Sequence, residues 1–452
     1  MAALQPGLQV GNVPGARLIQ SVGRAPDPSR DAIVERVHER LVEDLDVRAL
    51  DSLPEGERRA HVEAAVGRVL TEIGPGVQGV SRQDVVADVV DEILGFGPMQ
   101  PLLDDPNITE VMVNGPSEVF YERDGLIYAS AVRFRSHAHI RRIADRIVAP
   151  LGRRLDESSP MVDARLPDGS RVNIVLPPVA VGSTTITVRK FRTDRFDIDD
   201  LVRIGTISRD VAGFLRACVV SKVNIVISGG TGSGKTTFLN ALSAFIPKQE
   251  RIVTIEDPME IHLRQPHVVA LEARPAAGEG GTDVTQRDLV RNALRMRPDR
   301  IIVGEVRSYE AFDMMQAMNT GHEGSITTVH ANSPRDALSR IENMVMMAGF
   351  DLPTSAIRQQ MASALHLVVQ VSRMMDGSRR VTHVTEVVGL EGELVSIQDI
   401  FHMPDRSLDA QGRFVGQLVA TGVRPRFADR FRAFGVTEEW IEPPQVHVGV
   451  SL

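Results

Sequence analysis

The chain has 452 residues, a formal net charge of −8, 42% hydrophobic residues and 24% charged residues, a composition typical of a soluble globular protein with two or three domains. The acidic balance and an aromatic content of only 4% argue against a protein that coats nucleic acid or stacks single strands. The one cysteine, Cys218, excludes an internal disulfide and a four-cysteine zinc site, and its apolar surroundings predict a buried core thiol.

The N-terminal part of the chain is predicted to hold a tail and a small helical unit. Residues 1–27 carry Gly, Pro and Ser without periodicity, which indicates a disordered tail. Apolar residues then recur at helical spacing around 33–41, 62–69 and 85–93, so we predict a helical unit over 28–97. No run of about 18 apolar residues and no secretory signal occurs, and we expect neither a membrane span nor export.

Short strand-like stretches with turn residues between them follow the helical unit. They lie at 108–115, 118–125, 126–134, 171–179 and 183–191, and a basic helix is expected over 137–154. This mixture predicts an α+β (PAS-like) domain over 98–194. A polar stretch that reads as a linker over 195–206 comes next.

Apolar, β-branched stretches alternate with helical segments from residue 207 onward. Strands are expected at 224–228, 251–257, 299–305 and 324–331. Buried strands alternating with helices imply a mostly parallel sheet with helices on both faces. The predicted fold class is therefore α/β, with this domain over 207–425 and a C-terminal tail over 426–452.

The segment GGTGSGKT, which begins at Gly229, matches the phosphate-loop pattern G-x-x-x-x-G-K-[ST] at every fixed position. A predicted strand precedes it and a predicted helix follows it, as this loop requires. Its glycines let backbone N–H groups curl around phosphate oxygens at a helix N-terminus. We expect Lys235 to reach the β- and γ-phosphates and the Thr236 hydroxyl to ligate Mg²⁺. The expected nucleotide-binding residues are Gly229, Gly230, Thr231, Gly232, Ser233, Gly234, Lys235, Thr236 and Thr237.

Two predicted strands end in carboxylates that suit Mg²⁺ binding and water activation. Glu305 ends the stretch RIIVGE in the form of a Walker B element, and Glu256 ends RIVTIE. The carboxyl ends of parallel strands meet at one edge of a sheet, so we expect both acids beside the phosphates. The residues leave open which of the two polarises the attacking water. His330 ends another strand in the same register and is a candidate sensor of the γ-phosphate.

Four motifs in this order resemble the type II/IV secretion ATPase superfamily. They are the phosphate loop, the acidic box RIVTIEDPMEI, the Walker B box GEVRSYEAFDMMQAMNTGH and the histidine box GSITTVHANSP. The stretches at 105–116, 163–178, 188–191 and 292–307 resemble most the TadA/CpaF branch, the assembly ATPases of tight-adherence (Flp) pili. The single cysteine excludes the zinc module of other branches, which favours this branch or the conjugation-type branch.

The resemblance implies a Mg²⁺-dependent ATPase with a RecA-like P-loop motor domain, in which nucleotide lies between the α+β domain and the motor. It implies a homohexameric cytoplasmic ring at the inner face of the cell membrane, where it works on an inner-membrane platform protein of a pilus or secretion machine. The resemblance assigns phosphate and Mg²⁺ contact to Lys235 and Thr236. It assigns the catalytic acid to Glu305 and the acidic box to Glu256, and both residues are also candidate Mg²⁺ ligands. It places His330 in the histidine box and matches Arg171 and Arg189 to the family's arginines that close over the phosphates.

Three other functions remain open from the sequence. A conjugation-type (type IV) secretion ATPase carries the same motifs. A RecA-type nucleic-acid translocase is disfavoured by the acidic charge and the histidine box, and no direct nucleic-acid contact is expected. A nucleotide-binding scaffold that switches without turnover is disfavoured by the presence of Glu305.

Overall fold

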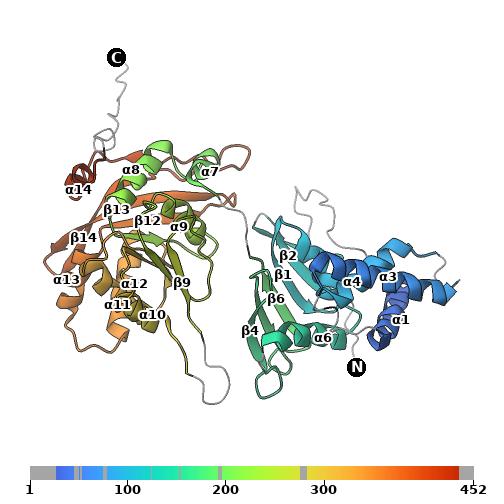
Figure 1. Cartoon of the computed structure of the whole chain (residues 1–452). Coiled ribbons are helices and arrows are strands. Elements are labelled where there is room, and N and C mark those ends of the chain that lie inside the picture. The colour runs from blue at the N-terminus through green and yellow to red at the C-terminus, as the bar shows by residue number, and fades with distance from the viewer. Residues whose placement is uncertain are drawn as a thin grey trace, which may run out of the picture. The chain divides into compact units, whose positions relative to one another are not determined.

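The computed structural model describes residues 27–44, 50, 53–74, 79–123, 125–151, 154–191, 196–274 and 282–436. The chain divides into two compact units, Met1–Arg192 and Thr193–Leu452 (Figure 1). The predicted N-terminal tail lies outside the described residues except for Asp27, and so does the end of the chain from residue 437. No helix in the described part of the chain is long and apolar enough to cross a bilayer.

Three helices begin the first unit, α1 (Pro28–Asp44), α3 (Glu55–Ile73) and α4 (Arg82–Ile93). They lie where the helical periodicity predicted them. The apolar stripes of the three helices share one core, in which Val37, Val62 and Val85 are fully buried. The hydroxyl of Ser81 accepts a hydrogen bond from Asp84 N, which caps the start of α4.

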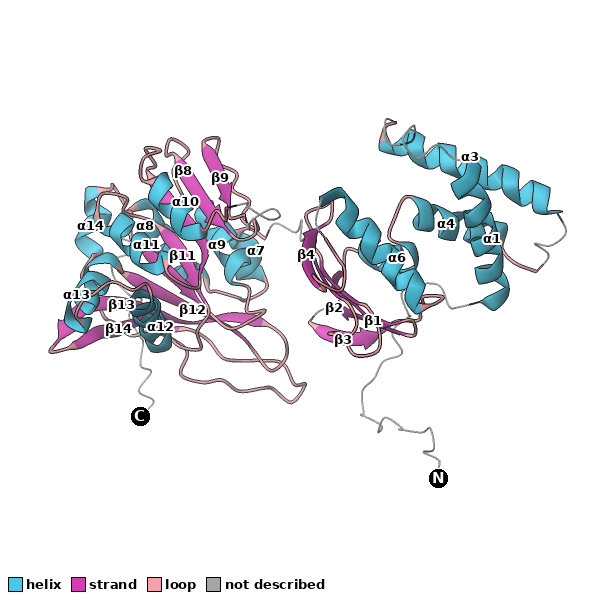
Figure 2. Ribbon diagram, turned by 90° about the horizontal axis from the view of Figure 1, so that it is seen from below, coloured by secondary structure: helices cyan, strands magenta, loops and turns pink. Residues whose placement is uncertain are grey.

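An antiparallel sheet forms the rest of the first unit, with strand order β3-β2-β1-β6-β5-β4. Helix α6 (His137–Val148) covers one face of this sheet (Figure 2), and Ile140 and Ile143 are buried there. The short helix α5 (Gln100–Asp104) precedes the first strand. The strands are β1 (Ile108–Gly115), β2 (Glu118–Arg123), β3 (Leu126–Ala129), β4 (Met161–Arg165), β5 (Arg171–Val175) and β6 (Thr185–Arg189). Of these, β4 was not predicted.

The second unit is built on one large sheet with strand order β15-β14-β13-β12-β7-β11-β10-β8-β9. Neighbours from β12 to β9 pair in parallel, whereas β12 to β15 pair antiparallel. The parallel strands are β7 (Ile225–Ser228), β8 (Ile252–Glu256), β9 (Val268–Glu272), β10 (Arg300–Val306), β11 (Ile326–Val329) and β12 (Leu367–Arg373), and the antiparallel additions are β13 (Arg379–Glu391), β14 (Leu394–His402) and β15 (Val419–Ala420).

Helices cover both faces of this sheet, each over its own hydrophobic core (Figure 1). One face carries α7 (Ile198–Arg203), α8 (Arg209–Val220), α9 (Lys235–Ser243) and α14 (Ala428–Ala433), and the other carries α10 (Gln286–Ala293), α11 (Glu310–Asn319), α12 (Pro334–Met347) and α13 (Thr354–Ala364). The predicted α/β class is confirmed, and the parallel part of the sheet contains every strand predicted for this domain.

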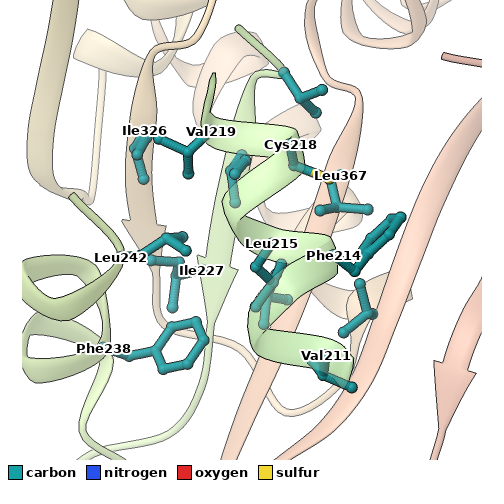
Figure 3. Close-up of a cluster of buried hydrophobic side chains, with 14 of the residues drawn as sticks. Val211, Phe214, Leu215, Cys218, Val219, Ile227, Phe238, Leu242, Ile326 and Leu367 are labelled. Carbon is teal, nitrogen blue, oxygen red and sulfur yellow. The ribbon is translucent and has the colours of Figure 1, made fainter. Parts of the chain in front are cut away.

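Helix α8 packs against β7 in the hydrophobic core that α7, α8, α9 and α14 share with the sheet (Figure 3). Its side chains Phe214, Leu215 and Cys218 point toward Ile227 of β7 and Leu367 of β12. Cys218 is fully buried, as predicted, and burial raises the pKa of its thiol well above the usual range. The strand that leads into the phosphate loop is therefore fixed from behind by close packing.

Two predicted boundaries of the second unit are wrong. The predicted linker 195–206 contains α7, because Asp197 and Asp200 form a reciprocal capping box and Leu201 is buried. The predicted tail 426–452 contains α14, because Phe427 and Phe431 pack edge to face with each other inside the core. The folded unit thus extends to at least residue 436.

Candidate functional site

The phosphate loop joins the end of β7 to the start of α9, and it holds all nine residues predicted to bind nucleotide. Gly232 and Gly234 adopt φ angles of 68° and 92°, which L side chains rarely adopt. A Cβ on Gly229 would collide with Ser233 Oγ and with the Val371 carbonyl. The curl of this loop therefore requires glycine at these three positions.

Lys235 is folded over the loop that precedes it. Its Nζ donates to the carbonyl oxygens of Gly229, at 3.0 Å, and Gly230, at 3.2 Å. The ammonium group thus lies at the mouth of the loop, beside the positive end of α9. This is the position from which a lysine reaches a bound phosphate.

A chain of hydrogen bonds runs from the loop to the end of β8. The Thr236 hydroxyl donates to Glu260 Oε2 at 3.1 Å. The backbone N–H groups of Glu260 and Ile261 donate in turn to Glu256 Oε2, at 2.6 Å and 2.9 Å. Glu260 was not among the predicted site residues. Its position four residues after Glu256 in the acidic box was the only sequence signal for it.

Glu256 is a buried carboxylic acid, with 2% of the residue exposed. Burial raises the pKa of its carboxyl group to about 7, against the opposing effect of the two backbone hydrogen bonds. Among the described residues, Oε1 of this side chain has no hydrogen-bond partner. An acid that titrates near neutral pH, with one free oxygen, is suited to accept a proton or to hold a water molecule.

The raised pKa of Glu256 predicts a pH-dependent gain of stability in the Glu256→Gln variant. The folded state favours the protonated acid, so its stabilising contribution is complete below the ordinary pKa and is lost as the pH rises through about 7. A shift of this size is worth about 3 kcal/mol. We expect Glu256→Gln to raise the thermal midpoint over wild type at about pH 8 and not at about pH 5.

The control for this measurement is Glu393→Gln, because Glu393 is exposed. Its midpoint relative to wild type should not depend on pH over the same interval. If the effect of Glu256→Gln is equal at both pH values, the Glu256 carboxyl is not held in its protonated form, and its assignment as a neutral-pH acid is wrong.

Glu305 lies on β10, between the strands that carry the other site residues. Parallel pairing aligns Val303 of β10 with Ile255 of β8, one residue before Glu256. A Cβ on Gly304 would lie 2.9 Å from Glu256 Cγ, which places the two acidic strand ends in contact. The Glu305 carboxylate is 25% exposed and accepts from Arg307 Nη2 at 2.6 Å.

His330 follows directly after β11, the neighbour of both β7 and β10. Burial lowers the pKa of its imidazole, and the positive charge of Lys235 is the next largest cause. The ring is thus neutral at physiological pH. Its electrostatic interactions with Lys235 and Glu305 show that the structure gathers these predicted residues at one edge of the sheet.

The predicted arginines lie in the first unit, whereas the other predicted site residues lie in the second. Arg171 of β5 and Arg189 of β6 are cross-strand partners, and Arg165 of β4 pairs with Arg171. The three form a row on the face opposite the buried Val172 and Ile186. We call these three residues the arginine row.

The oxygen atoms of the site suit a Mg²⁺ ion that arrives with nucleotide. The described residues contain no cluster of three or more His, Cys, Asp or Glu side chains able to hold a metal. Mg²⁺ in phosphate-transferring enzymes needs few protein ligands, because phosphate oxygens and waters complete its shell. The Thr236 hydroxyl, the Glu260 carboxylate and the unpartnered Glu256 Oε1 are donors of the required type.

A family model described as "Type II/IV secretion system protein" matches residues 92–407. A relative from Mycobacterium tuberculosis H37Rv that is named "Putative conjugal transfer protein" is 38% identical over 312 residues, which cover 68% of this chain and 88% of that protein. The type IV secretion system protein VirB11 of Brucella suis is 35% identical over 318 residues, covering 64% of this chain and 88% of the relative.

Two solved structures are similar to parts of this chain. The crystal structure of the Brucella suis VirB11 ATPase with sulphate has 34% identity and a TM-score of 0.36, and the match covers 64% of this chain and 91% of that chain. The crystal structure of the pilus retraction motor PilT with bound ADP has 22% identity and a TM-score of 0.48, and the match covers 62% of this chain and 79% of that chain.

Proposed function

This chain belongs to the type II/IV secretion system protein family, and from that premise we propose that it is a Mg²⁺-dependent ATPase that powers a secretion or pilus-assembly machine. The observation that carries the proposal is the continuous set of contacts from the phosphate loop to a buried acid. Thr236 contacts Glu260, Glu260 contacts Glu256, and Glu256 titrates near neutral pH. A structural glycine turn has no need of such an arrangement.

We propose the following division of work among the residues of the second unit. The loop N–H groups and Lys235 bind the phosphates, and Thr236 provides the hydroxyl for the metal. Bound Mg²⁺ supplies positive charge that neutralises the phosphate oxygens. Glu305 is the proposed catalytic acid, and Glu256 is the alternative for activating water, because its pKa of about 7 matches that task.

His330 and the arginine row are proposed to interact with the charge that develops on the γ-phosphoryl group. A neutral imidazole beside Lys235 can donate to a phosphate oxygen without adding to the positive charge there. The arginine row places three positively charged side chains in register on one sheet face, and Glu110 lies 3.8 Å from Arg189. Arg171 and Arg189 are therefore proposed to contact the phosphates in the working enzyme.

We further propose that the enzyme is a homohexamer that acts on an inner-membrane platform protein from the cytoplasmic side. The TadA/CpaF-like stretches favour assembly of a tight-adherence pilus. The relatives named as conjugal transfer and type IV secretion proteins favour a conjugation-type ATPase equally. Deleting the gene distinguishes the two, because the first reading predicts loss of surface pili and the second predicts loss of DNA transfer to recipient cells.

The enzymatic proposal predicts Mg²⁺-dependent ATP hydrolysis by the purified chain. We expect a particle with the mass of six chains and a hydrolysis rate that single-stranded DNA does not change. The measurements are phosphate release, with and without DNA and EDTA, and light scattering. Strong stimulation by DNA would support a nucleic-acid translocase. Tight nucleotide binding without any phosphate release would support a scaffold that switches without turnover.

A further inference from the structure

Two consecutive arginines, Arg379 and Arg380, lie between the phosphate loop and residues 204–206. We call residues 204–206 the entry segment, because they lie near the start of the second unit. The two arginines begin β13, and Arg379 is the cross-strand partner of Arg373 at the end of β12. The turn between these strands is fastened by Asp376, which accepts a hydrogen bond from Phe414 N at 2.7 Å. The β12–β13 hairpin therefore holds a defined position at the loop.

Arg379 contacts the backbone of the phosphate loop directly. Its Nε donates to the Gly232 carbonyl at 3.1 Å, and its Cδ lies 3.3 Å from where a Cβ on Gly234 would be. In a trans peptide the Gly232 C=O and the Ser233 N–H point in opposite directions. An arginine that holds this carbonyl therefore fixes the direction of the Ser233 N–H, one of the loop's donors for phosphate.

The Ser233 N–H is weakly engaged within the loop. Its nitrogen is 3.4 Å from the Gly230 carbonyl, at the long limit for a hydrogen bond. A phosphate oxygen can replace this weak acceptor at low cost. The positive charge of Arg379 on the other end of the same peptide also polarises the N–H and makes it a better donor.

Arg380 contacts the entry segment on the other side of the strand, because successive strand residues point to opposite faces. Its Nη1 donates to the Gly205 carbonyl, and the next residue, Val381, donates its N–H to Thr206 O at 2.9 Å. Gly205 has a φ of 77°, and a Cβ there would collide with the Arg380 guanidinium. Residues 204–206 directly follow α7, the first described helix of the second unit.

We propose that the β12–β13 hairpin couples nucleotide occupancy of the phosphate loop to residues 204–206. Arg379 is the positioning residue for the loop, and Arg380 is the link to Gly205. The inference rests on the proposed function, since it requires nucleotide on the loop. A phosphate bound to the Ser233 N–H stabilises the peptide orientation that Arg379 also stabilises. By thermodynamic linkage, Arg379 therefore raises the affinity of the loop for phosphate. The peptide orientation at Ser233 then affects the entry segment, because Arg380 follows Arg379 directly and contacts Gly205.

The first test is the affinity for a non-hydrolysable ATP analogue. We expect Arg379→Gln to weaken binding about tenfold and to leave kcat nearly unchanged, because the contact acts on ground-state binding. Arg379→Lys keeps a cationic donor and should recover most of the affinity. Arg424→Gln is the matched control, since Arg424 pairs with Asp429 on the exposed surface. Wild-type affinity in Arg379→Gln would overturn the assignment.

The second test is hydrogen exchange at the amides of Gly205, Thr206 and Val381, with and without the analogue at saturation. In wild type we expect the analogue to slow exchange at these amides. Arg380→Ala should remove that response while its affinity for the analogue stays within about twofold of wild type. A wild type without the response, or Arg380→Ala with a full response, would overturn the coupling.

The same experiments separate this inference from the proposed function. A wild-type chain that binds no analogue contradicts the ATPase proposal itself. A wild-type chain that binds the analogue and hydrolyses ATP, with no effect of Arg379→Gln, contradicts only the inference about the hairpin.

Discussion

Glu305→Gln is expected to retain ATP and to lose at least about 100-fold in steady-state hydrolysis. The amide is nearly isosteric with the carboxylate but can neither accept a proton nor stabilise positive charge. Phosphate binding by the loop and Lys235 does not involve this side chain, so the affinity for ATP should be close to that of wild type. The measurements are phosphate release and equilibrium binding of a fluorescent ATP analogue.

Two variants make this result interpretable. Glu393→Gln, on the exposed turn between β13 and β14, should hydrolyse ATP as wild type does. Glu256→Gln should be measured beside it. If Glu305→Gln hydrolyses ATP at near the wild-type rate while Glu256→Gln does not, the catalytic role passes to Glu256, whose pKa of about 7 already suits a base.

Lys235→Ala is expected to lower the affinity for ATP and ADP by about 100-fold. The variant loses a charge-assisted contact to the phosphates. It also loses the hydrogen bonds to the Gly229 and Gly230 carbonyls, each worth about 1 kcal/mol net, but the ammonium group is removed with them, so no charge is left unpaired. We therefore expect little change in thermal midpoint without nucleotide and the loss of the increase that nucleotide produces in wild type.

Lys248→Ala is the control for this variant, because Lys248 is exposed shortly after the same helix. It should bind nucleotide as wild type does and should show the full thermal shift. Undiminished binding by Lys235→Ala would mean that the loop does not hold the phosphates, which would contradict the proposed function at its base.

The core of the second unit was readable from the sequence because its strands are short, apolar and β-branched. The stretches that end at Ser228 and Glu256, for example, are β7 and β8. The antiparallel strands β13 and β14 were not predicted. In β14 most side chains are partly buried, so the apolar signal that marks the central strands is diluted by residues such as Gln398 and Asp399.

Part of the site could also be predicted from the sequence, because motif residues lie at fixed distances along the chain from the ends of these strands. Lys235, Glu256, Glu305 and His330 follow this rule. Arg379 does not, because it reaches Gly232 across 147 positions of the chain, and only the pairing of β12 with β7 brings it there. Helix α7 had a local signal, the acidic pair Asp197 and Asp200, whose capping role became evident only with the buried Leu201 beside it.

The hydrogen bonds that Lys235 donates to its own loop bear on the local stability of that loop. A crowded cation with no hydrogen-bond acceptor would destabilise the loop and favour its local unfolding. Here the two carbonyl oxygens at 3.0 Å and 3.2 Å already satisfy the ammonium group. The side chain that is proposed to bind phosphate therefore also has its charge satisfied by the loop that carries it.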